Sequence, residues 1–506
     1  MALSANSTAA AARHRLSGNL GVTGILFMVV AAAAPLTVIG SGVPLGFVLG
    51  NGVGFPAMYG FCAIVLLLFA VGLVTMAGQV RKPGAFFTFI GYGLGRQMGL
   101  AAAYLAVLAY TAIQLSVHAY LGYILSTTLI RLGGPVVPWW LFTVVGIALV
   151  GVFGFGRIDL SGKVLAVLLV GEVGVVLALV GAVVFSGAAP EGLSLAPFAW
   201  HNVVSGAPGV GLMFAMAAFI GFESTVIFRD EVKDPHRTLP RATYAALIGI
   251  GVFYILGSWG LIMAWGPQEI VAQTAKDPGS LILTTTRRYL GVVGVTTVNI
   301  VLITSMFACV LSIHNVIARY QHAMANAGIL PGPLGRVHHK HASPHSSSIV
   351  QTATAAGLTL SCGLVGADPV RQVFTWAAGV ATLAIAILMA VTGIAVMVYF
   401  AHTAPVRASV WKTVIAPALG VIGLMFTTLL IIDNFPMLLG DIDRAGQPRF
   451  GVVSWCMFGL IGVLPALGIG QARMLRVKRP AVYARILTAI SESADAIATP
   501  LPRSRD

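Results

Sequence analysis

The sequence predicts an all-α membrane protein with twelve transmembrane helices, of which the first and the sixth are discontinuous. Hydrophobic residues make up 58% of the 506 residues, and charged residues make up only 9%, against roughly a quarter in soluble domains. Mean hydropathy is +0.92, and apolar stretches long enough to cross a bilayer recur along the chain. We expect spans at about 22–48, 54–79, 98–130, 136–155, 162–186, 207–230, 242–265, 293–322, 347–366, 372–400, 410–432 and 451–472.

The charges between these stretches predict the orientation. With the amino terminus inside, 23 of the 30 lysines and arginines lie on the cytoplasmic side and seven on the opposite side. This is the positive-inside distribution, so we expect a multi-pass protein of the cytoplasmic (plasma) membrane with both termini in the cytoplasm. The net charge of +14 then faces anionic lipid, and membrane lipid rather than nucleic acid is the expected partner.

Two spans contain helix-breaking residues near their centres. Pro35 lies in the middle of the first span, where it removes a backbone hydrogen bond. Gly221 holds a central place in the sixth. The first span opens one group of five spans and the sixth opens the next, and interruptions at corresponding positions of two halves indicate a transporter binding site. A packing kink at Pro35 and close helix packing at Gly221 are the alternative explanations.

The span count divides the chain into two five-span halves with additions at either end. The predicted segments are a cytoplasmic amino-terminal tail (1–18), a first inverted repeat with spans 1–5 (19–190), a second with spans 6–10 (191–401), accessory spans 11 and 12 (402–476) and a cytoplasmic carboxy-terminal tail (477–506).

Two carboxylates, Glu172 and Glu223, lie inside apolar stretches of membrane length. A carboxylate in hydrocarbon is costly and by default marks an ion path, a proton relay or a substrate site. The alternative is a glutamate near a helix end that reaches the headgroups. The four cysteines also lie in apolar stretches and are expected to be small buried residues, so neither a metal nor a cofactor is predicted.

Three motifs resemble the amino acid–polyamine–organocation superfamily. The stretch G-F-E-S-T-V-I-F-R-D-E-V-K-D-P-H-R-T-L-P-R-A at 221–242 is similar to its sixth-span signature, with Asp234 where asparagine is common. The stretch K-P-G-A-F-F-T-F-I-G-Y-G-L-G-R at 82–96 resembles its motif after the second span, with Phe in place of Tyr. The stretch H-N-V-I-A-R-Y-Q-H-A-M-A-N-A-G-I-L-P at 314–331 resembles the end of its eighth span, with Asn326 and Ala327 in place of Arg-Asp.

The resemblance implies a 5+5 inverted repeat of the LeuT-like type with two accessory helices. It also implies secondary active transport of amino acids or related amines by alternating access, with a proton favoured as the coupling ion and no enzymatic activity. A sodium-coupled symporter and an amino acid/amine exchanger are the alternatives with the same fold. A multispan membrane enzyme and a non-transporting sensor are the alternatives of another class, and the sequence indicates no oligomeric state.

Similarity to the family places the substrate at the two interruptions. The free N–H groups of the half-helix after Pro35 suit a substrate carboxylate, and freed carbonyls of the sixth span suit its ammonium. Members commonly carry Gly-Ser-Gly where this chain has Pro35-Leu36-Thr37. The implied contacts are Ala33, Ala34, Pro35, Leu36 and Thr37 on the first span, Ala106, Tyr110 and Ile113 on the third, and Phe214, Ala217, Ala218, Phe219, Ile220 and Gly221 on the sixth, with Phe214 or Phe219 as the gate.

The implied coupling residues are Glu172, Glu223, Thr304 and Ser305. Many family members have a lysine in the fifth span where this chain has Glu172. Thr304 and Ser305 resemble the hydroxyl pair of a sodium site in the eighth span. We expect Glu172 in its protonated form to donate a hydrogen bond to freed carbonyls of the first span, because apolar surroundings favour the neutral acid; an ionised Glu172 holding a cation with the two hydroxyls is the alternative.

Overall fold

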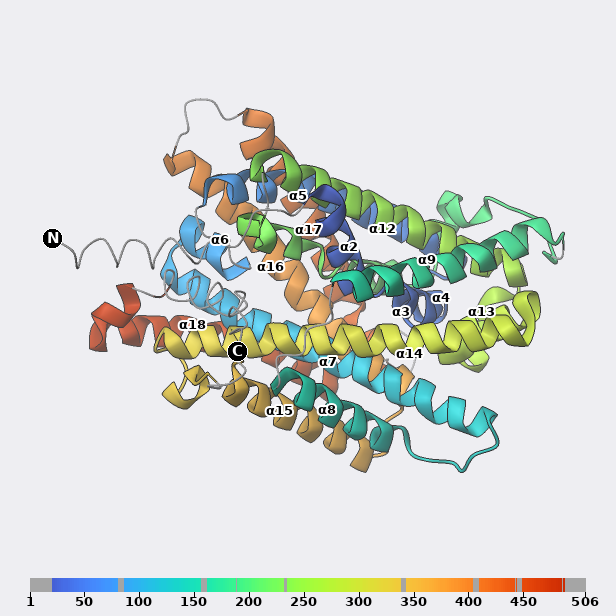
Figure 1. Ribbon diagram of the computed structural model, residues 1–506. Coiled ribbons are helices and arrows are strands. Elements are labelled where there is room, and N and C mark those ends of the chain that lie inside the picture. The colour runs from blue at the N-terminus through green and yellow to red at the C-terminus, as the bar shows by residue number, and fades with distance from the viewer. Residues whose placement is uncertain are drawn as a thin grey trace, which may run out of the picture.

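The protein is described by a computed structural model, and all of its regular elements are helical. The structure describes residues 21–80, 86–155, 162–187, 189–231, 234–337, 343–403, 409–441, 443, 448–484 and 486. The predicted amino-terminal tail and most of the carboxy-terminal one lie outside these residues. Figure 1 shows long helices running side by side in one bundle, with α14 extending along its length.

Nine helices in the described ranges are long and apolar enough to cross a membrane. They are Gly52–Gln79, Arg96–Arg131, Ala166–Phe185, Pro208–Val226, Pro235–Trp265, Pro278–Asn326, Pro369–Thr403, Trp411–Leu439 and Val452–Lys478. The other three expected spans also coincide with helices. The first is interrupted, the fourth is the short helix α8 (Trp139–Phe155), and the ninth is the more polar α15 (His345–Leu364).

The elements follow the predicted order. The first half contains α2 (Val22–Ala32), α3 (Pro35–Gly40), α4 (Gly42–Leu49), α5 (Phe55–Gln79), α6 (Phe86–Leu94), α7 (Arg96–Arg131), α8 and α9 (Gly162–Phe185). The second half contains α10 (Trp200–Val203), α11 (Pro208–Ala217), η4 (Phe222–Glu231), α12 (Pro235–Trp265), α13 (Ile270–Lys276), η5 (Pro278–Ser280), α14 (Leu281–Asn326), α15, η7 (Pro369–Phe374) and α16 (Thr375–Thr403). The chain continues through η8 (Trp411–Ile415) and α17 (Ala416–Leu439) to α18 (Val452–Lys478).

The eighth span differs from its predicted limits. We expected it to begin near residue 293, but helical structure already begins at Leu281 and continues to Asn326. The two parts meet at Gly291, whose φ of 65° and ψ of −160° are not helical. A positive φ of this size is available to glycine without steric cost, so the chain changes direction there.

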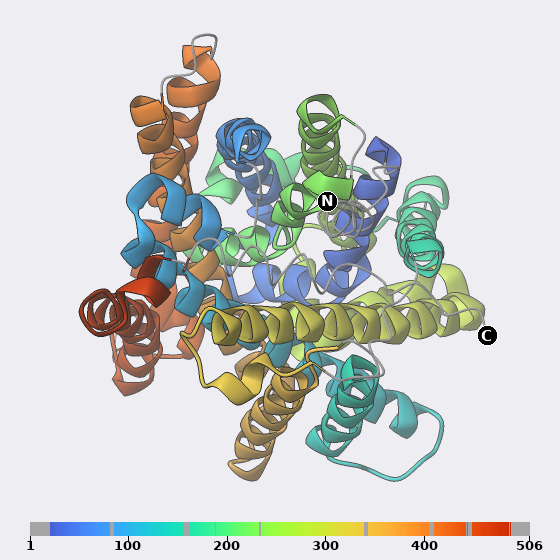
Figure 2. The same ribbon diagram turned by 60° about the vertical axis from the view of Figure 1, so that its left-hand side comes forward.

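The two broken spans lie side by side in the bundle. Helix α2 contacts η4, and α4 contacts α11, so each half of the first span meets one half of the sixth. Helix α9 packs against α2 and α3, and α14 packs against α3. In Figure 2 the yellow helix α14 runs along one side of these segments. We call residues 33–34 the first break and residues 218–221 the second break.

Small residues allow the helices to approach closely, as expected where lipid gives helices little hydrophobic reason to associate. A Cβ added at Gly420 of α17 would lie 2.6 Å from the backbone nitrogen of Phe69 in α5 and 2.8 Å from its Cα. Backbone atoms cannot move aside as a flexible side chain can, so this contact requires glycine.

Replacing Gly420 with alanine is therefore expected to destabilise the protein by ~1–3 kcal/mol, the usual cost of overpacking a core. Gly459→Ala in α18 is the matched control, because an added Cβ there meets nothing within 4 Å. Thermal unfolding in detergent measures both variants. Equal unfolding temperatures for the two would contradict the close contact between α17 and α5.

Candidate functional site

The first break separates α2 from α3 and has a strained backbone. Ala34 has φ 46° and ψ 67°, and within the described ranges it is the one residue other than glycine with positive φ. A left-handed conformation costs a residue with a Cβ roughly 1–2 kcal/mol. Pro35 follows at the first helical position, where its missing N–H removes no hydrogen bond. The first N–H that α3 can offer is therefore that of Leu36.

Glu172 of α9 occupies this donor. Leu36 N–H donates to Glu172 Oε2, with 3.0 Å between the nitrogen and the oxygen, and both residues are buried. We expected Glu172 to donate to carbonyls of the first span; in the structure its carboxyl group instead accepts from an N–H. The reason is the local geometry, because the half-helix after Pro35 presents its amino end, and amino ends expose donors.

The two hydroxyls assigned to the eighth span do not converge. Ser305 is buried next to the Glu172 carboxyl group, although its Oγ makes no hydrogen bond of good geometry among the described residues. Thr304 is exposed, and its hydroxyl donates to Ile300 and Val301 of its own helix. Neighbouring residues on a helix point about 100° apart, so the expected Thr304–Ser305 pair is corrected to Ser305 alone.

Glu223 organises the second break. Gly221, at φ 112°, donates its N–H to Glu223 Oε2 over 2.8 Å. Tyr110 of α7 donates its hydroxyl to Glu223 Oε1 over 2.9 Å. Each carboxyl oxygen thus holds a different part of the protein, one the irregular backbone of the sixth span and the other the third span.

The carbonyls of the second break divide into two groups. Those of Ala217 and Phe219 accept from the N–H groups of Ile220 and Phe222 in tight turns. No backbone partner is found for the carbonyls of Ala218 and Ile220 among the turn and loop hydrogen bonds of the described residues. The second break therefore leaves acceptors near Glu223 that a ligand ammonium group can use.

The third-span residues lie on the side of α7 that faces the sixth span. Ala106 is fully buried, and Ile113 is half-buried. The Tyr110 ring lies 5.8 Å from that of Tyr320 in α14, measured between centroids. The Tyr320 hydroxyl is buried, and no hydrogen-bond partner is found for it in the described part of the chain. Sequence reasoning missed Tyr320, which lies in the motif at 314–331.

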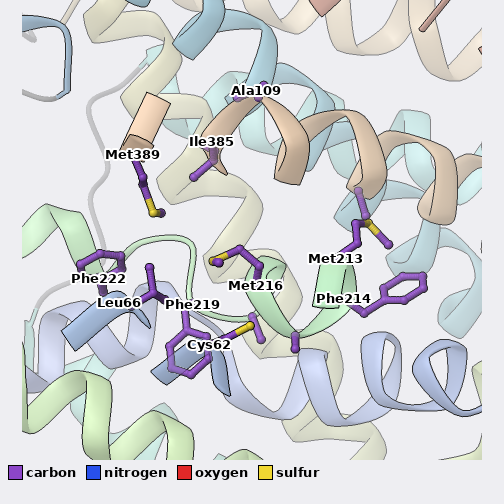
Figure 3. Close-up of a cluster of buried hydrophobic side chains, with 14 of the residues drawn as sticks. Cys62, Leu66, Ala109, Met213, Phe214, Met216, Phe219, Phe222, Ile385 and Met389 are labelled. Atoms are coloured by element: carbon purple, nitrogen blue, oxygen red, sulfur yellow. The ribbon is translucent and has the colours of Figure 1, made fainter. Parts of the chain in front are cut away.

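The expected gates lie within a packed apolar cluster. Figure 3 shows Phe214 and Phe219 among buried side chains that include Leu66 of α5 and Met389 of α16. Both aromatic residues are essentially inaccessible to solvent. The Phe219 ring meets that of Tyr254 in α12 edge-on, with centroids 6.2 Å apart. In this conformation both aromatic residues are core residues.

A second buried polar group, which the sequence analysis missed, joins α7, α14 and α15. Gln351 Nε2 donates to Gln114 Oε1 over 2.7 Å, and Gln114 Nε2 lies 3.4 Å from His314 Nδ1. His314 Nε2 lies 2.9 Å from Ser348 Oγ. Buried polar groups that satisfy one another fix the relative position of the helices that carry them. These helices therefore form a rigid support beside the broken spans.

One end of the first span is covered by the connection after α12. The Tyr120 hydroxyl of α7 lies 2.7 Å from the carbonyl oxygen of Gly40 and 3.1 Å from that of Gly279. Tyr123, one turn further on, donates to Asp277 over 2.7 Å. Helix α13 also contacts α4. The segment from α13 to η5 therefore lies against the carboxy-terminal half of the first span.

A bundle of membrane-length helices with two adjacent interrupted helices, each bonded to a buried carboxyl group, has the features of a membrane transporter. The chain belongs to the amino acid permease family, whose model matches residues 24–435.

The chain is similar to curated transporters from bacteria and a fungus. It is 23% identical over 373 residues to the low-affinity putrescine importer PlaP of Escherichia coli K12, covering 72% of this chain and 79% of that protein. It is 28% identical over 185 residues to the putrescine transporter PotE of Haemophilus influenzae, covering 35% of this chain and 40% of that protein. It is 26% identical over 245 residues to the general amino-acid permease GAP2 of Candida albicans, covering 46% of this chain and 40% of that protein.

Proposed function

We propose that this protein is a secondary active transporter that moves amino acids or related amines across the cytoplasmic membrane by alternating access. The observation that carries the proposal is the pair of adjacent breaks, each hydrogen-bonded to a buried carboxyl group. Relatives named as putrescine transporters and as an amino-acid permease support both substrate classes.

The proposed architecture has twelve spans, with 19–190 and 191–401 as inverted repeats and 402–476 as accessory spans. The order of the helices and the corresponding positions of the two breaks support it. The distribution of lysine and arginine supports cytoplasmic termini. In this arrangement the half-helices on either side of the breaks move relative to the support formed by α7, α14 and α15.

The substrate is proposed to bind between the breaks. The uncommitted carbonyls of Ala218 and Ile220 and the carboxyl group of Glu223 are suited to an ammonium group. Tyr110 supplies an aromatic face and holds Glu223 in place. The contact between η5 and α4 supports a closed state on that side, and opening there would require release of the Tyr120 contacts.

A proton is the proposed coupling ion. Glu172 and Glu223 are buried and lie where a change of protonation would alter the backbone bonds of a break. Sodium is less favoured than the sequence alone suggested, because Thr304 points away from Ser305. A hard cation needs several oxygen ligands, and Glu172 with Ser305 offers few of them.

Uptake into proteoliposomes tests the proposal. The purified protein is reconstituted and screened with radiolabelled amino acids and amines under an imposed pH difference. We expect at least one compound to accumulate against its gradient, with protein-free liposomes as the control. Flux that only equilibrates would contradict active transport, and binding without any flux would instead identify a sensor.

A further inference from the structure

The buried interior carries acidic groups without basic partners. Among the buried side chains of the described residues, Glu172 and Glu223 are the two acids, and no lysine or arginine is present. Buried charges are normally paired, since an isolated charge in an apolar interior is costly. A bound ligand with positive charge and no negative charge complements such an interior, whereas a zwitterion adds a further carboxylate to it.

The donors that a ligand carboxylate would need are already bonded. Pro35 has no N–H, and the N–H of Leu36 donates to Glu172. The next two donors of the half-helix, Thr37 and Val38, both bond the carbonyl of Ala34, over 3.0 and 3.3 Å. A substrate carboxylate placed at the first break would meet no free donor on these residues and would lie against a second carboxyl group.

We propose that Glu172 stands in for the carboxylate of an amino acid, so that this transporter selects organic amines that lack a carboxylate. The inference rests on the proposed transport function and assigns the substrate class of that site. Glu172 reaches the first break from the fifth span, so the protein itself supplies the acidic half of the complementary pair. The substrate then needs only its ammonium group and an apolar body.

The second break provides the matching place for that ammonium group. Each oxygen of Glu223 accepts one bond, from Gly221 or Tyr110, and a carboxylate oxygen has room for two. Tyr110 and Tyr320 lie with ring centroids 5.8 Å apart beside it. Aromatic faces attract alkylammonium groups, so a carboxylate and two tyrosine rings together suit an amine.

Matched pairs of compounds test the selection. Each pair is an amino acid and the amine left when its carboxylate is removed: leucine with 3-methylbutylamine, and ornithine with 1,4-diaminobutane. Each compound competes for uptake of a labelled member of a pair by the full-length protein in proteoliposomes. We expect the amine to compete about tenfold better than its amino acid or more, because like-charge contacts in a dry site cost several kcal/mol. Amino acids that compete better than their amines would overturn the inference.

Substitution of Glu172 tests its role. Glu172→Ala frees the Leu36 N–H and removes the charge, so the preference for amines is expected to fall about tenfold or reverse. Glu172→Gln removes the charge but keeps an acceptor oxygen for Leu36, and should shift the preference less. The matched control is Glu269→Gln, an exposed residue of the connection between α12 and α13, which should leave the preference unchanged.

The outcomes separate this inference from the proposed function. Thermal stability of each variant reports folding, and the preference of the parent protein provides a test that needs no variant. Transport of amino acids with amines excluded would overturn the substrate class and leave transport intact. Folded protein that takes up neither member of any pair would overturn both. A Glu172→Ala variant that transports with the parent preference would show that Glu172 does not act as the substitute carboxylate.

Discussion

Replacing Glu223 with glutamine is expected to reduce the initial rate of uptake by about tenfold or more. Two donors, the N–H of Gly221 and the hydroxyl of Tyr110, bond the two oxygens of Glu223. Glutamine offers one acceptor oxygen and one NH₂ group, so one donor would face another donor. An unpaired buried donor costs ~1–3 kcal/mol, which is about fivefold to a hundredfold in an equilibrium. Initial uptake into proteoliposomes, measured at several pH values, tests the effect.

A graded comparison separates the two bonds of Glu223. Tyr110→Phe removes one bond and keeps the one to Gly221, so we expect a smaller loss of uptake than for Glu223→Gln. Glu269→Gln removes an exposed carboxylate and should leave uptake unchanged. If Glu223→Gln retained the uptake rate and pH dependence of the parent, Glu223 would have no part in the mechanism.

Proton-driven accumulation is expected to disappear when Glu172 is replaced with glutamine. Protonation weakens the acceptor that Leu36 N–H uses, since hydrogen bonds to an ionised group are about twice as strong as neutral ones. The proton would thereby change the stability of the first break and bias one transport state. An imposed difference of about one pH unit stores ~1.4 kcal/mol and supports about tenfold accumulation for one proton per substrate. In Glu172→Gln the ratio is expected to fall to about one.

Independent pH and sodium gradients distinguish the possible coupling ions. Each gradient is imposed alone on the parent and on Glu172→Gln, and the steady-state accumulation ratio is measured. Accumulation driven by sodium alone would contradict proton coupling. A variant that accumulates substrate as the parent does would show that Glu172 only stabilises the first break.

Much of the helical arrangement follows from local properties of the chain. The second span was expected at 54–79, and the corresponding helix is Gly52–Gln79. Such agreement arises because backbone polar groups in lipid must be satisfied within the helix, so a long apolar run is helical wherever it crosses. The interruption at Pro35 is equally local, because the missing N–H and the ring of proline disrupt a helix regardless of its neighbours.

The partners at the two breaks were decided by tertiary structure. The sequence placed Glu172 inside a span, but only the packing of α9 against α3 brings its carboxyl group to Leu36 N–H. Thr304 and Ser305 are adjacent in sequence, yet helix packing exposes one and buries the other. A hydropathy pattern determines that a segment is a helix, whereas the rotation of that helix and its neighbours depend on contacts between residues far apart in the chain. For this protein, the sequence determined the helical membrane architecture and its breaks, and the tertiary structure decided which side chains bind the broken ends.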